Sequence, residues 1–222
     1  MRINKLDGLR GIFSLMVVLF HFQEQFIPSF IYNSVIIRHS NAFVDFFFVL
    51  SGFVIALNYY RMNDINQLIL FIKKRLIRLY PLVFYTSVLY FIFKVISEMY
   101  FPGLRIPEGI NTLTNRLIDS LLLTDSTPIF GNALGVNAPN WSISSEVISY
   151  FIFGISMLIF KDKEFYKKLF FSIVLLLSGG ILFCKGNLFF DGDFGFIRGI
   201  YNFSFGYFIY EIYSKITHYH FS

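Results

Sequence analysis

The chain has 222 residues, of which 55% are hydrophobic, 21% aromatic and only 15% charged, and its formal net charge is +5. A soluble domain of this length carries more charge, so the composition excludes an ordinary soluble globular protein. In a membrane protein a positive net charge reports orientation in the bilayer rather than binding to nucleic acid. The lipid bilayer is therefore an expected partner, and nucleic acid is not.

The predicted elements are apolar runs separated by short polar segments. Residues 64–80 combine apolar side chains at helical spacing with a basic cluster, which is typical of a helix on a membrane surface, and Pro81 is expected to bend the chain into the next span. Residues 112–125 predict a second interfacial helix, and 128–140, rich in Gly, Pro and Asn, predict a loop. The runs long enough to suggest membrane spans are 8–27, 42–60, 80–100, 141–160, 168–184 and 194–213.

These elements predict an all-α fold, a polytopic transmembrane helical bundle of about six spans plus interfacial helices, forming one domain over residues 1–222. With the amino terminus in the cytoplasm, thirteen lysines and arginines lie on the inner side and four on the outer side. The positive-inside rule therefore predicts a multi-pass protein with a cytoplasmic amino terminus.

Four ionisable residues from different spans are expected at similar depth, in the outer half of the bilayer. They are His21, Asp45, Glu146 and Arg198. Ionisable groups inside a membrane are costly and usually face a cavity or one another, so the set favours a polar reaction chamber. The alternative is a set of structural ion pairs that hold the bundle together.

Arg10 and His21 are eleven residues apart, which places them on one helical face about 16 Å apart along the axis. The helix amino terminus at LDGLRG, with its arginine, favours an anion such as phosphate on the cytoplasmic side. Arg75 and Arg78 supply a second cationic pair on that side. Anchoring of the topology is the alternative role for these arginines.

The motifs of this chain resemble those of the acyltransferase 3 family of bacterial integral-membrane O-acyltransferases. The resemblance rests on LDGLRGIFSLMVVLFH with its arginine-to-histidine spacing, FFFVLSGFVI at 46–55, KKRLIRLYPL at 73–82, NWSISSEVISYF at 140–151 and IRGIYNFSFGYFIYE at 197–211. Family members usually have about ten spans, so the chain resembles an amino-terminal portion, truncated at its carboxyl end.

The resemblance implies transfer of an acyl group, most often acetyl from acetyl-CoA, to a hydroxyl of a cell-envelope carbohydrate at the bacterial inner membrane. The acceptors of the family include lipopolysaccharide, capsule, exopolysaccharide and peptidoglycan. His21 matches the family's essential histidine, and Glu146 matches the acid of the fourth-span motif. The arginines that match the family's acyl-CoA-binding positions are Arg10, Arg75 and Arg78.

In the mechanism expected from these matches, His21 acts as general base or transient acyl carrier, and Asp45 or Glu146 orients its imidazole. Neither a metal nor a bound cofactor is expected, because acyl-CoA is the donor substrate. The acceptor-binding residues are expected to be Trp141, Ser142 and Arg198.

Several alternatives remain open. Trp141 could be an interfacial anchor, Ser51 and Ser144 could be nucleophiles or could hydrogen-bond within the bundle, and Gly52 with Ala56 suggests helix packing. The chain could also be a small-molecule transporter, an inactive fragment or a non-catalytic partner in envelope assembly.

Overall fold

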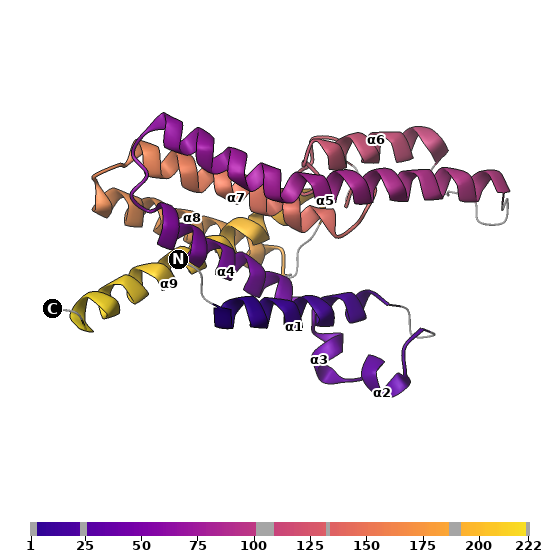
Figure 1. Cartoon of the computed structure of the whole chain (residues 1–222), viewed down its shortest axis with the longest axis horizontal. Helices are drawn as coiled ribbons and strands as arrows, with labels where there is room; N and C mark the ends of the chain where they lie inside the picture. Colours follow the sequence, from indigo (N-terminus) through magenta and orange to yellow (C-terminus); the bar gives the residue numbers. More distant parts are fainter. Residues whose placement is uncertain (1–3, 23–25, 101–108, 132–133, 187–191, 221–222) are drawn as a thin grey trace. The chain divides into compact units, whose positions relative to one another are not determined.

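The computed structural model describes residues 4–22, 26–100, 109–131, 134–186 and 192–220, and over these residues the chain is helical and contains no strand (Figure 1). The all-α prediction is therefore confirmed. The helices are α1 (Asn4–His21), α2 (Ser29–Tyr32), α3 (Val35–Arg38), α4 (Ala42–Tyr59), α5 (Ile65–Tyr100), α6 (Gly109–Leu121), α7 (Asn140–Ile159), α8 (Glu164–Cys184) and α9 (Gly195–His220), with a 3-10 turn, η3, at Gly192–Phe194.

Four of the described helices are long and apolar enough to cross a bilayer, namely α4, α5, α7 and α8. They confirm the second to fifth predicted spans. Helices also occupy the positions of the first and sixth spans, but α1 and α9 do not belong to these four. Helix α1 ends at His21, well before the predicted end at residue 27, and residues 23–25 lie outside the described part of the chain.

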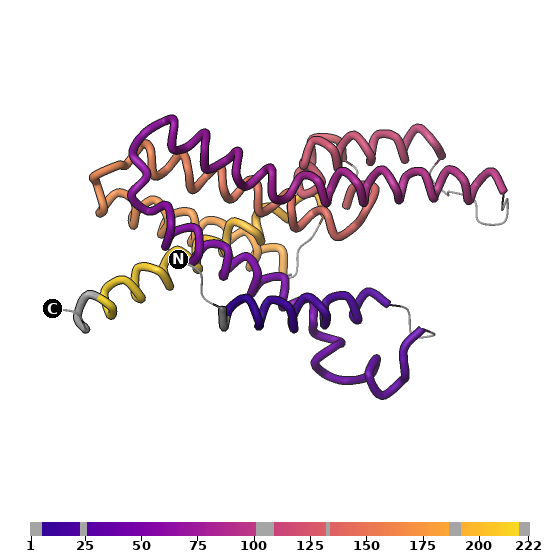
Figure 2. Tube along the Cα trace, viewed as in Figure 1, coloured from indigo at the N-terminus to yellow at the C-terminus, as the bar shows by residue number. Residues whose placement is uncertain are grey.

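The prediction of a separate surface helix over 64–80 is wrong, because α5 is one helix of 36 residues that continues through Pro81 (Figure 2). At 1.5 Å per residue it is about 54 Å long, more than the roughly 30 Å hydrocarbon core of a bilayer. Proline removes one helical hydrogen bond, here the one to the carbonyl of Ile77. Packing of α5 against α6 and α7 offsets this loss.

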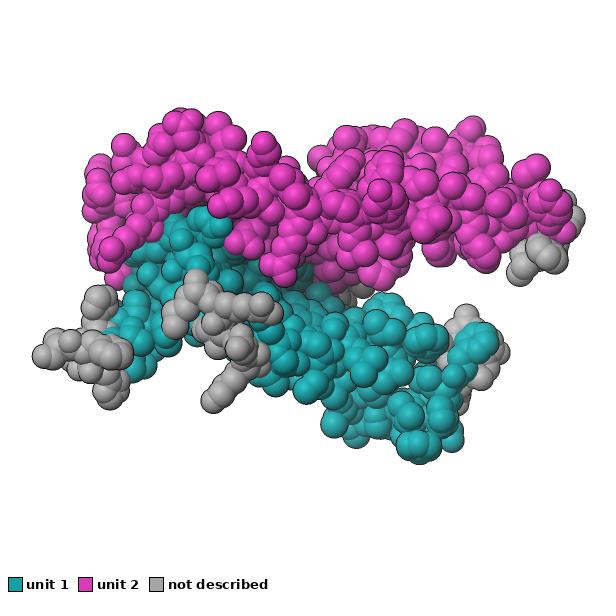
Figure 3. All heavy atoms as spheres, viewed as in Figure 1, with its two compact units in different colours: residues 1–60, 202–222 teal, residues 61–201 magenta. Residues whose placement is uncertain are grey.

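The chain forms two compact units (Figure 3). Unit 1 contains residues 1–60 and 202–222, and unit 2 contains residues 61–201, so α9 begins in unit 2 and continues in unit 1. In unit 1, α4 and α9 approach so closely that a Cβ atom on Gly52 would lie 2.1 Å from the carbonyl oxygen of Phe203. The packing role expected for Gly52 is therefore confirmed.

In unit 2, α5 and α7 run antiparallel. Near the start of α5, Phe71 contacts Tyr150 and Phe153 of α7, and further along the helix Ser87 accepts a hydrogen bond from Asn140. The last turns of α5, from Phe91 onward, pack against α6, as Figure 1 shows. The basic segment at 73–78 of α5, which was predicted on the membrane surface, consequently lies beside α7.

Candidate functional site

His21 is the last residue of α1, and its imidazole bonds to its own helix. The Nδ1 atom lies 2.8 Å from the carbonyl oxygen of Val17. A carbonyl only accepts hydrogen bonds, so Nδ1 carries the proton in the neutral ring and Nε2 keeps its lone pair. The Val17 carbonyl thus accepts the Nδ1 hydrogen bond that a carboxylate accepts in a catalytic triad. The imidazole is exposed, and its Nε2 atom can act as a base.

Arg10 lies on the same helix as His21, so the eleven-residue spacing does place the two side chains on one face of α1. The guanidinium of Arg10 is 4.0 Å from the carboxylate of Asp7, one turn earlier, and both side chains are partly exposed. An exposed ion pair of this kind is weak. The pair therefore leaves Arg10 accessible to a stronger anion such as a phosphate.

Asp45 lies in the first turn of α4, where its carboxylate joins two helices of unit 1. The side-chain nitrogen of Asn202 on α9 donates to Asp45 Oδ1 at 2.8 Å. Asn202 interrupts the apolar run 194–213 that was predicted as the sixth span, and the sequence assigned it no role. Its polar side chain in an apolar run was the available signal, because such groups often hydrogen-bond across helices.

Arg75 and Glu146, which the sequence predicts on the cytoplasmic side and in the outer half of the bilayer, share Tyr150 as a neighbour in unit 2. The guanidinium carbon of Arg75 lies 6.0 Å from the ring centroid of Tyr150, and the Tyr150 hydroxyl donates to Glu146 Oε1 at 2.5 Å. The two residues acquire this common neighbour because α5 runs alongside α7. Arg78, one turn further along α5, is exposed.

Trp141 and Arg198 also meet in unit 2. Arg198 is fully buried, and its guanidinium carbon lies 5.4 Å from the Trp141 ring. Gly195 lets α9 approach this ring, since a Cβ atom there would lie 2.7 Å from it. Trp141 is itself buried, which contradicts its alternative role as an exposed anchor. Ser142, the third expected acceptor residue, donates to the carbonyl of Pro139 at 2.8 Å.

A pair of buried acids that the sequence did not single out lies at the end of α6 and in the turn that follows it. Asp119 and Asp125 are fully buried, with Thr124 donating to Asp119 and Ser120 donating to Asp125. Burial raises the pKa of Asp125 from 3.8 to about 6, partly opposed by the Ser120 hydrogen bond. Burial likewise raises the pKa of Asp119, and the nearby Asp193 raises it further.

Ser144, a candidate nucleophile, has a structural role. Its hydroxyl donates to the carbonyl of Leu123 at 2.7 Å and shares a hydrogen bond with the Ser126 hydroxyl at 2.8 Å. These bonds tie α7 to the turn after α6. Within the part of the chain that the structure describes, no group of three His, Cys, Asp or Glu side chains is arranged to hold a metal ion.

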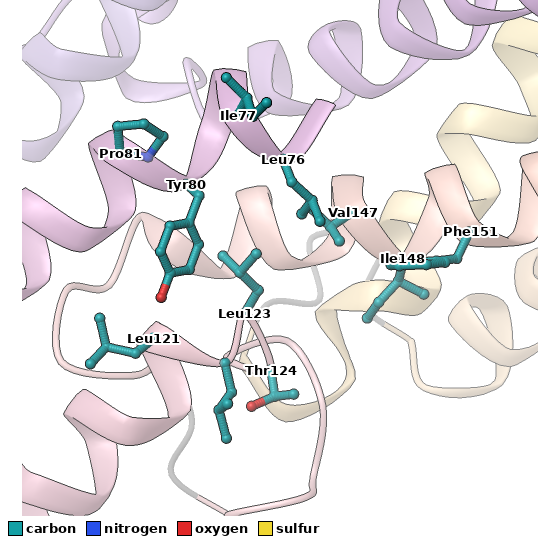
Figure 4. A pocket seen from close by; sticks show the side chains of 11 residues that line it. Leu76, Ile77, Tyr80, Pro81, Leu121, Leu123, Thr124, Val147, Ile148 and Phe151 are labelled. Carbon is teal, nitrogen blue, oxygen red and sulfur yellow. The ribbon is translucent and has the colours of Figure 1, made fainter. Parts of the chain in front are cut away.

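An apolar groove of about 750 Å³ lies between α5, α7 and the turn that follows α6 (Figure 4). At about 100° per residue, its lining positions on α5 and α7 lie on other faces of these helices than Arg75 and Glu146. The groove is therefore separate from the site that contains those two residues. It is lined by Leu76, Ile77, Tyr80, Pro81, Leu121, Leu122, Leu123, Thr124, Val147, Ile148 and Phe151.

Comparison with known proteins identifies a family whose model matches the chain. The acyltransferase domain of the acyltransferase 3 family matches residues 3–220, almost the whole chain. The chain is 30% identical over 159 residues to the acyltransferase MdmB of Streptomyces mycarofaciens, and the match covers 68% of this chain and 38% of that relative. No solved structure matches the chain.

Proposed function

The chain belongs to the acyltransferase 3 family, whose members transfer acyl groups other than aminoacyl groups, and from this premise we propose its substrates. We propose that it moves an acyl group, most often acetyl, from acyl-CoA to a hydroxyl of a cell-envelope or exported carbohydrate. The site of action is the bacterial inner membrane, with the amino terminus in the cytoplasm.

The observation that carries this proposal is the 2.8 Å distance between His21 Nδ1 and the Val17 carbonyl oxygen, from which the proton is assigned to Nδ1 and the lone pair to Nε2. Its Nε2 takes the proton of the acceptor hydroxyl while the hydroxyl oxygen attacks the thioester carbon. The carbon–sulfur bond then breaks, and the departing CoA sulfur receives the proton from the imidazolium. The Val17 carbonyl, bonded to Nδ1, keeps the ring oriented and stabilises its cation through both steps.

The donor site in this proposal is cationic. Arg10, Arg75 and Arg78 bind the phosphates of CoA, since guanidinium groups form charge-assisted and often bidentate bonds to phosphate oxygens. Arg10 shares a helical face with His21, about 16 Å away along α1, which suits a donor with a charged end and a long arm.

The acceptor site in this proposal is the pair of Trp141 and Arg198, with Ser142 beside it. An aromatic ring and a guanidinium are side-chain types that recognise a sugar ring and its hydroxyls, and the assignment rests on these types, since both side chains are buried in the structure. Asp45 in unit 1 and Glu146 in unit 2 act as carboxylates that stabilise positive charge.

The test compares two histidines that share one local geometry. His39 also bonds through Nδ1 to the carbonyl four residues earlier, at 2.8 Å, and is also exposed, so it is a matched control for His21. In purified protein in lipid nanodiscs, His21→Gln should lower CoA release from acetyl-CoA by roughly 10²-fold or more, the scale of general acid–base catalysis. His39→Gln should match the wild type. Wild-type turnover by His21→Gln, at equal protein, would refute the assignment.

A further inference from the structure

The apolar groove of unit 2 has a buried wall and an exposed rim (Figure 4). Among its lining residues, Leu123 and Val147 are buried. Ile77 and Tyr80 on α5 and Phe151 on α7 are exposed. Both helices are long and apolar enough to cross a bilayer, so this rim is open to the acyl chains of the surrounding lipid. The volume of about 750 Å³ is that of a pocket for a small molecule.

Two lysines continue the groove-lining face of α5 toward the start of the helix. Lys73 precedes Tyr80 by seven residues, and Lys74 precedes Pro81 by seven residues. Seven residues are two helical turns to within about 20°, so each lysine lies on the face of its groove residue, about 10 Å earlier along the axis. Both lysines are exposed. The segment 79–93 that follows carries no charged residue, so the lysines stand at the edge of an apolar stretch of α5.

A ligand that fits both features has an anionic head group and an apolar chain. Lysines at the edge of a membrane-spanning segment attract the phosphates of anionic lipids, and an apolar groove shields a hydrocarbon chain. We propose that the groove binds an acyl chain of an anionic phospholipid whose phosphate lies at Lys73 and Lys74. Tyr80, between the lysines and the uncharged part of α5, is of the aromatic type that is enriched at the level of lipid head groups. The lipid site uses neither Arg75 nor Arg78, which belong to the proposed donor site.

The test of the head-group contact is native mass spectrometry of the full chain released from nanodiscs. The nanodiscs contain equal amounts of dioleoyl-phosphatidylglycerol and dioleoyl-phosphatidylcholine, which have the same acyl chains and differ in head-group charge. The double variant Lys73→Gln/Lys74→Gln removes the two lysines of the site. Its matched control is Lys161→Gln/Lys163→Gln, which removes two exposed lysines from the turn between α7 and α8 of the same unit.

The wild type should retain phosphatidylglycerol in preference to phosphatidylcholine. Loss of Lys73 and Lys74 should lower the retained phosphatidylglycerol by about 5-fold for each lysine removed and leave phosphatidylcholine unchanged. The control at Lys161 and Lys163 should behave as the wild type does.

The acyl-chain contact is tested by filling the groove. Ile77→Trp places a larger side chain at an exposed lining position, and it should lower the retention of both lipids, because they have the same chains. Leu89→Trp is the matched control, since Leu89 is equally an exposed apolar residue of α5 but does not line the groove. It should retain both lipids as the wild type does.

Several results would overturn this assignment. An equal loss of phosphatidylglycerol in the two double lysine variants would indicate attraction by the general surface charge, and unchanged lipid retention in Ile77→Trp would place the acyl chain elsewhere. Displacement of phosphatidylglycerol by equimolar palmitoyl-CoA, which also joins an anionic head to an acyl chain, would assign the groove to the acyl donor. A mass of two chains without lipid would assign it to a second copy of the protein.

Discussion

Replacement of Asp125 with asparagine should stabilise unit 2 above pH 6. Asp125 is fully buried in the turn after α6, near Asp119, and burial raises its pKa from 3.8 to about 6 in the folded protein. The folded state therefore binds the proton more tightly than the unfolded chain does. The contribution of Asp125 to the free energy of unfolding is then fully present below about pH 4, is lost as the pH rises from 4 to 6, and stays lost above pH 6.

The expected stability difference follows from the gap between the pKa values of Asp125 in the unfolded and the folded protein. A difference of about 2 pH units, at 1.36 kcal/mol per unit, corresponds to about 3 kcal/mol that the wild type loses between pH 4 and pH 7. Asparagine stays neutral over this range, and its side-chain oxygen can still accept the hydrogen bond from Ser120. Asp125→Asn should therefore exceed the wild type by up to about 3 kcal/mol at pH 7 and approach it near pH 4.

The assay is urea unfolding in a mild detergent, followed by the fluorescence of Trp141. This residue is the only tryptophan of the chain and is buried in unit 2, so its emission reports unfolding of the unit that contains Asp125. Asp162→Asn, at an exposed position between α7 and α8, is the control for a general change in charge. A stability difference between Asp125→Asn and the wild type that does not vary from pH 4 to pH 7 would refute the reasoning.

Further predictions concern packing, a helix-to-helix bond and topology. Gly52→Ala should lower the free energy of unfolding in urea by roughly 1–3 kcal/mol, because the added Cβ would meet the backbone of α9. The control is Gly180→Ala, which has open space around it and should be neutral or stabilising. Equal effects of the two substitutions would contradict the close approach of α4 and α9. Asn202→Leu should cost about 1–3 kcal/mol by removing the bond to Asp45, and an unchanged midpoint would show that the bond does not contribute. Cys184 is the single cysteine of the chain and is exposed, and the predicted orientation places it on the outer side of the membrane. It should therefore react with a membrane-impermeant maleimide in spheroplasts. A cysteine that is protected in spheroplasts but reacts in inverted vesicles would reverse the predicted orientation.

The local sequence was enough to predict helices, because in lipid each backbone amide and carbonyl must find its partner within the same segment. The second to fifth spans were therefore predictable from the length of their apolar runs. The same reasoning placed Arg10 and His21 on one face of α1, since a helix fixes the angle between any two of its residues. It failed at Pro81, where a helix break was expected, because packing on α6 and α7 supports the helix on both sides.

Contacts between helices depended on pairing and register, which the apolar pattern leaves undetermined because a lipid-facing and a helix-facing leucine look alike in sequence. Only the tertiary structure brought Arg75 to Tyr150, and Asn202 to Asp45. The raised pKa of Asp125 likewise arises from burial by its surroundings. The sequence by itself determined the helices and the types of functional side chain, because these depend on local hydrogen bonding and chemistry. The antiparallel packing of α5 and α7 decided which of those side chains share a site.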